Sequence, residues 1–183
     1  MLKLLMMMFL FSSCAHAPAT KSIVVENGSV GPITGSVLDS DILAQGGSLA
    51  LVPFKAGAQA EATDELDHIS LMILKGIKDS VDEHKGTLQV VDAADGHPKL
   101  ALQGYIKEFS KSGKLSRMLL KPNQYSLELE GELWLISNGQ RLVNFSTSKK
   151  FNPKKEKPID VAYALGREIG DFISDHAKQK GSL

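Results

Sequence analysis

The clearest pattern of apolar and polar positions lies between Tyr125 and Leu135, where apolar or small residues alternate with Ser126, Glu128, Glu130 and Glu132. A period of two residues predicts a β-strand with one buried face and one solvent-exposed face. Asn138-Gly139 then favours a tight hairpin turn, and residues 142–151 are expected to return antiparallel. The leucines also suit a membrane hairpin, but one hairpin leaves open edges, so we expect them to pack against helices.

Two other segments repeat their apolar residues at helical spacing. The first begins at Thr63 or Asp64, either of which can cap it, and runs to about Lys85, with Gly86 as its end; its apolar positions are Leu66, Ile69, Ile73, Leu74, Ile77 and Val81. The second is the last regular segment of the chain. We expect Asp160 to cap it and one stripe to hold Ala162, Leu165, Ile169, Phe172 and His176.

Shorter apolar runs predict three further strands. Residues 48–54 form a continuous run that ends near a proline, as in a strand buried on both faces, and residues 88–92 and 100–109 follow the first helix. The predicted order is strand, helix, four strands, helix. This order indicates an α/β (α+β) fold, with a mostly antiparallel sheet of about five strands and two long helices on one face.

The amino terminus has the pattern of an export signal. Lys3 precedes an apolar run over residues 4–11, which is too short to span a bilayer, and Ser12 and Ser13 precede Cys14. The ending Phe-Ser-Ser-Cys resembles the cleavage site of bacterial lipoproteins, in which the cysteine becomes the lipid-modified first residue. We therefore expect residues 1–13 to be a lipoprotein signal peptide and Cys14 to carry the lipid. The alternative is an ordinary secretory signal with residues 15–17, Ala-His-Ala, as its cleavage motif.

The resemblance to lipoproteins also implies a location. The residue after Cys14 is Ala15, not the aspartate that retains lipoproteins at the inner membrane, so the expected site is the periplasmic face of the outer membrane. Residues 14–47 are rich in Gly, Ser, Ala and Thr, and we interpret them as a flexible tether with at most one short strand. Residues 48–183 are then a single periplasmic domain.

Composition and motifs exclude several kinds of chemistry. The chain has 21 basic and 21 acidic residues, which disfavours nucleic acid as a partner, and one cysteine, which rules out an internal disulfide. His68 and His84 would lie ~24 Å apart on one helix, too far to share a metal. The sequence has no Gly-x-Ser-x-Gly elbow, phosphate loop or dinucleotide fingerprint. We expect no catalytic residue, no metal and no cofactor, and thus not an enzyme.

Three weaker candidates have simpler structural explanations. His97 lies close to Asp92 and Asp95, but such turns use Asp and Gly for their backbone conformation. His176 is expected to pack or to complement the carboxyl end of the last helix. The alternating glutamates invite a glycosidase or cation-binding interpretation, and the solvated face of a sheet explains them better.

A basic connector, residues 149–157, precedes the last helix. Its lysines are Lys149, Lys150, Lys154, Lys155 and Lys157. It is either a soluble loop or a contact for anionic lipid head groups or for an acidic partner, and the sequence does not separate these.

The element order and the opening strand, Leu-Ala-Leu-Val-Pro-Phe, resemble the periplasmic domain shared by the curli-secretion lipoprotein CsgG, the penicillin-binding-protein activator LpoB and the amino-terminal domain of TolB. The segment 102–109 and the Asn138-Gly139 pair are also similar to uncharacterised lipoproteins of this group. The resemblance implies a non-enzymatic binding or scaffold module in envelope assembly, secretion or cell-wall machinery. Its partner would be another envelope protein or a second copy of the chain. A periplasmic ligand carrier, which needs a closed apolar cavity, and an envelope hydrolase are the alternatives.

Overall fold

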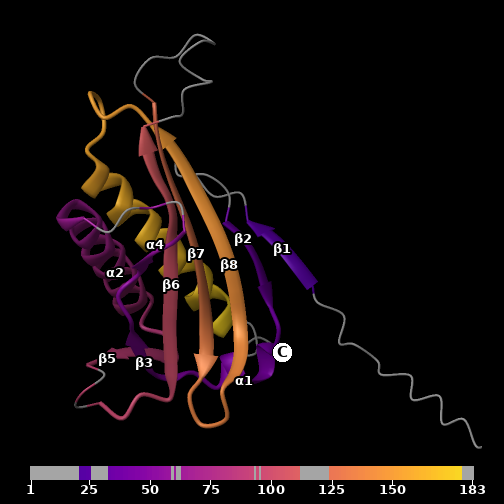
Figure 1. Cartoon of the computed structure of the whole chain (residues 1–183). Coiled ribbons are helices and arrows are strands. Elements are labelled where there is room, and N and C mark those ends of the chain that lie inside the picture. Colours follow the sequence, from indigo (N-terminus) through magenta and orange to yellow (C-terminus); the bar gives the residue numbers. More distant parts are fainter. Residues whose placement is uncertain are drawn as a thin grey trace, which may run out of the picture.

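The computed structural model describes residues 21–25, 33–58, 60, 63–92, 94, 96–111 and 124–178, and the side chains of all of these except 21–25, 110 and 111. One sheet of eight strands and two long helices make up most of this part of the chain (Figure 1). The elements in chain order are β1 (Lys21–Val25), β2 (Ile33–Val37), α1 (Ser40–Ala44), β3 (Gly47–Leu51), β4 (Lys55–Ala56), α2 (Asp64–His84), β5 (Leu88–Val91), β6 (Leu100–Lys111), β7 (Tyr125–Leu135), β8 (Gln140–Phe151) and α4 (Pro158–Lys178).

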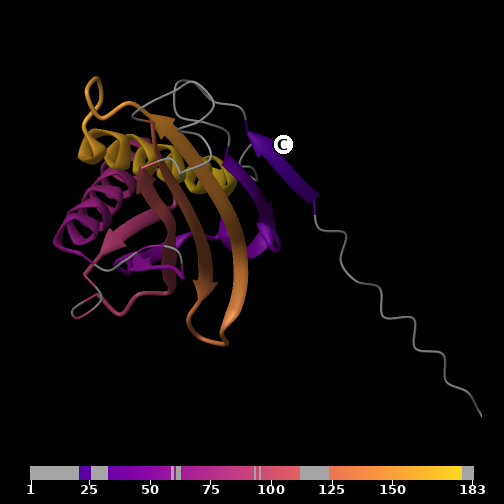
Figure 2. The same cartoon turned by 45° about the horizontal axis from the view of Figure 1, so that its top comes forward.

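The sheet has the strand order β1-β2-β8-β7-β6-β3-β5, and β4 also pairs with β6. Every pairing from β1 to β6 is antiparallel, whereas β3, β4 and β5 join in parallel. Helices α2 and α4 lie side by side on one face of the sheet (Figure 2). The predicted α+β class, the mostly antiparallel sheet and the two helices on one face are confirmed, with eight strands in place of about five.

The predicted flexible tether over residues 14–47 is wrong in its boundary. Strand β1 pairs with β2 from Lys21 to Val25, β2 pairs with β8, and helix α1 follows directly. Ile33 and Leu43 are buried in the main core. The folded domain therefore begins well before residue 48, and these elements close one side of the sheet.

The alternating strand β7 buries the face that the sequence predicts. Leu127, Leu129 and Leu133 are fully buried between the sheet and the helices, while the glutamates between them are partly exposed. Tyr125 pairs with Phe151 and Leu135 with Gln140, so the predicted hairpin with β8 is also confirmed. Its turn spans residues 136–139, and Gly139 adopts the left-handed conformation (φ 67°) that this turn requires.

The helix boundaries follow their local chemistry. The hydroxyl oxygen of Thr63 accepts a hydrogen bond from the Leu66 amide (3.2 Å), and Lys85, the cap residue after the last helical residue His84, adopts a left-handed conformation. Helix α4 begins at Pro158, the favoured first helical residue. Asp160 thus lies in its first turn, where it complements the helix dipole, and the prediction that it caps the helix is wrong.

Glycines allow α2 and α4 to pack with their backbones in contact. A methyl group added to Gly166 would lie 2.2 Å from the carbonyl oxygen of Ile73, and one added to Gly76 would lie 2.2 Å from that of Tyr163. No side chain fits at either position. This close packing fixes the two helices as one layer over the sheet.

Candidate interaction surfaces

Cys14, the predicted lipid attachment site, and the signal peptide before it lie outside the described residues. Within the described part of the chain, no helix is long and apolar enough to cross a membrane. The same part holds no group of three or more His, Cys, Asp or Glu residues placed to bind a metal ion.

The basic connector lies at the end of the sheet where β8 finishes, at the top of Figure 1. Its turn is organised by Asn152, whose side-chain oxygen accepts from the Lys154 amide (3.0 Å). Lys149 is 14% exposed and pairs with Glu156 (2.8 Å), so it stabilises the connector itself. The other four lysines, Lys150, Lys154, Lys155 and Lys157, are exposed and available to a partner.

An open groove crosses the face of the sheet that the helices leave uncovered. Its volume is about 400 Å³, and the described residues that line it are Thr34, Gly35, Ser36, Gly104, Tyr105, Glu130, Gly131, Glu132, Arg141, Asn144, Phe145 and Ser146. Gly104, Gly131, Phe145 and Gly35 are paired in register across four neighbouring strands. These four positions direct their side chains toward the helices, as the buried Phe145 and the closeness of Gly35 to Phe172 show. The groove floor is therefore backbone, and the polar side chains of the alternate positions form its walls.

Glu130 and Glu132 of β7 line this groove, and both of them and the nearby Glu128 are paired with cations. Lys107, at a β-bulge in β6, lies 3.2 Å from a carboxylate oxygen of Glu128 and 2.7 Å from one of Glu130. These hydrogen bonds raise the pKa of Lys107. Arg141 donates to Glu132 (2.7 Å). Each glutamate of this row therefore lies beside a basic side chain on the outer face of the sheet.

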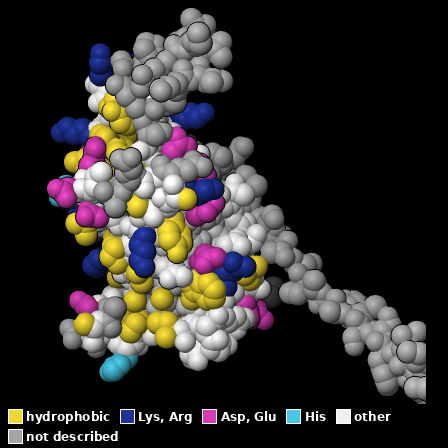
Figure 3. All heavy atoms as spheres, viewed as in Figure 1, with side chains coloured by type: hydrophobic (Ala, Val, Ile, Leu, Met, Phe, Trp, Pro, Cys, Tyr) yellow, Lys and Arg dark blue, Asp and Glu magenta, His cyan; other side chains and the backbone are white. Residues whose placement is uncertain are grey.

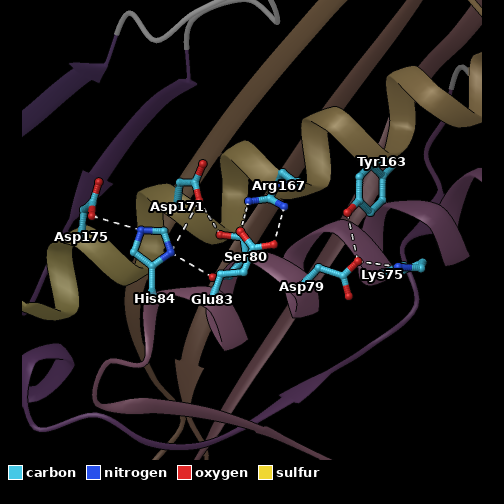
Figure 4. A network of polar contacts seen from close by, with 9 residues as sticks. All are labelled: Lys75, Asp79, Ser80, Glu83, His84, Tyr163, Arg167, Asp171 and Asp175. Carbon is cyan, nitrogen blue, oxygen red and sulfur yellow. Dashed lines mark hydrogen bonds and ion pairs between the residues drawn. The ribbon is translucent and has the colours of Figure 1, made fainter.

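A polar network joins α2 to α4 on their solvent side (Figure 4). Tyr163 donates to Asp79 (3.0 Å), Arg167 pairs with Glu83 through both terminal nitrogens, and Lys75 pairs with Asp79. Hydrogen bonding by Lys75 lowers the pKa of Asp79, and hydrogen bonding by Arg167 lowers that of Glu83. These side-chain contacts link the two helices along their interface.

His84 completes this network, with Asp175 at 3.5 Å and Asp171 at 3.6 Å. Ser80 donates to Asp171 (2.5 Å), which brings a serine, a histidine and an aspartate together. The geometry is not that of a catalytic triad, because Ser80 is fully buried and its proton faces the carboxylate, and Nδ1 of His84 lies 2.9 Å from the Ser80 carbonyl oxygen. The sequence placed His84 on α2, but only the helix packing brings Asp171 and Asp175 to it.

The other histidines among the described residues lie in the core, in a turn and on the helix surface. His176 is buried, with Nδ1 2.7 Å from the Phe172 carbonyl oxygen, and its ring is tilted by 52° against the Phe172 ring, with the ring centroids 4.5 Å apart. His97 lies in a turn with φ 40° and is not grouped with carboxylates as a metal site among the described residues. His68 is exposed on α2.

Glu168 on α4 has the most perturbed carboxyl group that the structure describes. Burial, reinforced by the nearby charge of Asp171, raises its pKa to about 7, and Lys149 opposes the shift. A raised carboxyl pKa means that the folded state holds the proton more tightly, so this group lowers stability progressively from about pH 4.5 to pH 7. The penalty is absent below that range and complete above it.

We therefore expect Glu168→Gln to stabilise the domain at pH 8 by about 1 kcal/mol, after a discount for solvent screening, and to have little effect near pH 4. Urea unfolding of the variant and the unmodified protein at pH 4, 6 and 8 measures the difference. An equal difference at all three pH values would show that the Glu168 proton is not responsible.

Comparison with known proteins establishes the fold. No protein-family model and no curated protein matches the chain. Its structure is similar to a subunit of the PelC dodecamer from Paraburkholderia phytofirmans, with a TM-score of 0.56, 13% identity, and coverage of 79% of this chain and 97% of that one. A substituted form of the same dodecamer matches with a TM-score of 0.52, 12% identity, and coverage of 84% and 98%.

A lipoprotein from Neisseria meningitidis, GNA1162, is more distant, with a TM-score of 0.45, 11% identity, and coverage of 68% of this chain and 96% of that one. At these identities the likeness to PelC concerns the fold alone. The resemblance to the curli-secretion group stays a prediction.

Proposed function

We propose that the protein is a lipoprotein anchored by Cys14 to the periplasmic face of the outer membrane, where its domain self-associates as a non-enzymatic scaffold of the cell envelope. The observation that carries this proposal is the fold, which covers 97% of a PelC subunit whose solved form is a dodecamer. The amino-terminal pattern that ends at Cys14 supports the anchor.

The sheet has two edges that could meet in an assembly. Among the described strands, β1 pairs only with β2, and β5 pairs only with β3, at opposite ends of the strand order. Such edges leave backbone donors and acceptors unpaired. A head-to-tail contact that closes on itself makes a ring and covers both ends of every subunit.

The distribution of charge also suits a head-to-tail contact. Helices α2 and α4 carry ten acidic and four basic residues, a net charge of −6 with histidines neutral. Because the whole chain has 21 of each sign, all other residues together carry 17 basic and 11 acidic ones. The exposed lysines of the basic connector and the acidic helix layer are therefore complementary surfaces of neighbouring copies.

The two alternative functions have less support. A ligand carrier needs a closed apolar cavity, and the groove on the outer sheet face is open with polar walls. An envelope hydrolase needs a nucleophile or an acid–base pair that faces a pocket, and the serine, histidine and aspartate at the helix contact are not arranged as one.

Native mass spectrometry of the lipidated protein in detergent tests self-association. We expect a discrete oligomer, and we expect the double variant Lys154→Glu/Lys155→Glu to dissociate it. Lys178→Glu is the control, because it reverses one lysine, in place of two, within the acidic helix layer and should leave the oligomer intact. A monomer at every protein concentration would contradict the scaffold proposal.

A further inference from the structure

Leu38 and Ile136 are among the few large apolar side chains that the described domain leaves exposed, at 36% and 49%. Both lie at the end of the sheet opposite the basic connector, the lower end in Figure 1. Leu38 follows β2, and its amide donates to the Leu142 carbonyl oxygen (2.8 Å); Ile136 opens the β7–β8 turn. Single exposed aliphatic residues are common on proteins, so their exposure alone decides nothing.

A hydrogen bond links the segment that holds Leu38 to the end of the β7–β8 turn. The side chain of Gln140, just after the turn, donates to Asp39, the residue after Leu38 (3.1 Å). The turn itself reads Ile-Ser-Asn-Gly over residues 136–139, is exposed and carries no charge. We call Leu38 and residues 136–139 the turn end; hydrophobic side chains also gather near the lower end of the face in Figure 3.

The point where the described chain begins lies at the same level of the sheet. Lys21, the first residue of β1, pairs with Val37, and Val37 pairs with Val143 of β8. Val143 is three residues from Gln140, a rise of ~10 Å along the strand, and eight residues from Phe151, a rise of ~27 Å. The turn end is thus near Lys21, and the basic connector is far from it.

The length of chain before Lys21 limits where the lipid can be. Cys14 precedes Lys21 by seven residues, which span at most ~25 Å in any conformation. This reach covers the ~10 Å to the turn end. It falls just short of the ~27 Å along the sheet to the basic connector. The turn end is therefore the end of the sheet that lies well within reach of the anchor, and the connector lies at the limit of that reach.

We propose that the turn end, Leu38 with residues 136–139, rests on the lipid surface to which Cys14 is anchored, with the basic connector directed away from the bilayer. The proposal rests on the anchor at Cys14. The lipid holds the domain at a high effective concentration beside the bilayer, so a small apolar surface suffices to select one orientation. The connector lysines then face the periplasm and are free for a protein partner.

Single cysteines carrying an environment-sensitive fluorophore test the orientation, because an acylated Cys14 leaves no other thiol to label. The lipidated full-length protein is reconstituted in phosphatidylethanolamine/phosphatidylglycerol vesicles, with a cysteine placed by Ile136→Cys, Leu71→Cys, Tyr105→Cys or Lys155→Cys. Leu71 on α2 is a matched control, since it is an exposed aliphatic residue (57%), and Tyr105 (51%) reports on the groove face.

We expect quenching by aqueous iodide to fall at least threefold at position 136 when vesicles are present, and to change little at the other three positions. Protection at 155 or at 105 without protection at 136 would overturn the proposal, because the domain would then stand on its connector or lie on its groove face. Equal quenching at all four positions would overturn it as well. A labelled thiol in the unsubstituted protein would instead show that Cys14 is not acylated, which contradicts the proposed function before orientation is measured.

Discussion

Replacing Leu133 with aspartate should unfold the domain. Leu133 is fully buried in β7, on the face of the sheet that the helices cover. A carboxylate there would lie among apolar side chains with no partner, and it also removes the packing of the leucine. We expect the free energy of unfolding to fall by more than ~4 kcal/mol, which is a large part of the 5–15 kcal/mol that stabilises a typical domain. Leu129→Asp should behave in the same way.

Glu130→Gln is the matched control on the opposite face of the same strand. Glu130 pairs with Lys107, but that lysine also contacts Glu128, so it keeps a partner when Glu130 is neutralised. The free energy of unfolding should change by no more than ~0.5 kcal/mol. Circular dichroism during urea unfolding measures both variants. A cooperative melt for Leu133→Asp at the unmodified midpoint would contradict the assignment of the buried face.

Gly166→Ala should destabilise the domain by about 2–3 kcal/mol, although the same change in an isolated helix stabilises by about 1 kcal/mol. The reason for the opposite sign is the contact between helices. The added methyl group would lie 2.2 Å from the Ile73 carbonyl oxygen, so α2 and α4 must move apart and lose packing along their length.

Gly86→Ala makes the same chemical change where space exists, because the new methyl group meets only the Lys178 side chain, at 3.4 Å. We expect an effect of about 0.5 kcal/mol or less there. Gly76→Ala combined with Gly166→Ala should cost less than the sum of the two single variants, since the first already separates the helices. The midpoint of urea unfolding measures each variant, and additive losses would contradict a shared contact.

The parts of the fold that the sequence predicts well are those with a strong local period. The Leu/Glu alternation of β7 and the apolar stripes of α2 and α4 each repeat over three or more turns or pleats, so their buried faces follow from spacing alone. The Asn138-Gly139 pair similarly marks its turn because Gly139 can adopt a positive φ.

Strands β1 and β2 could not be found in this way. Strand β2 reads Ile-Thr-Gly-Ser-Val, which is too short and too polar to signal a buried strand. Its place depends on residues far along the chain: β8 supplies its hydrogen bonds, and Phe172 of α4 covers the space above Gly35. A segment whose burial comes from distant partners looks like a tether in sequence.

For the candidate surfaces, too, the sequence identifies the residues but not the partners that they contact. The lysines of the basic connector can be recognised in the sequence as a cluster. The ion pair between Lys149 and Glu156, which makes Lys149 part of the connector's own structure, depends on the geometry of the turn. The pairing of Lys107 with two glutamates depends on a β-bulge that shifts the register of β6 and β7. The contacts of His84 depend on how α2 and α4 pack. In each case the residue itself can be read from the sequence, whereas the residue that it contacts is set by the tertiary structure.

The state of the amino terminus tests the central claim most directly. Mass spectrometry of the protein extracted from membranes identifies the first residue and its modification. We predict a mature chain that begins at Cys14 and carries the added mass of acyl chains, and a Cys14→Ser variant that is released from the membrane fraction. A mature chain that begins at Pro18 with an unmodified amino terminus, the product of cleavage after Ala17, would contradict the lipid anchor and the account built on it.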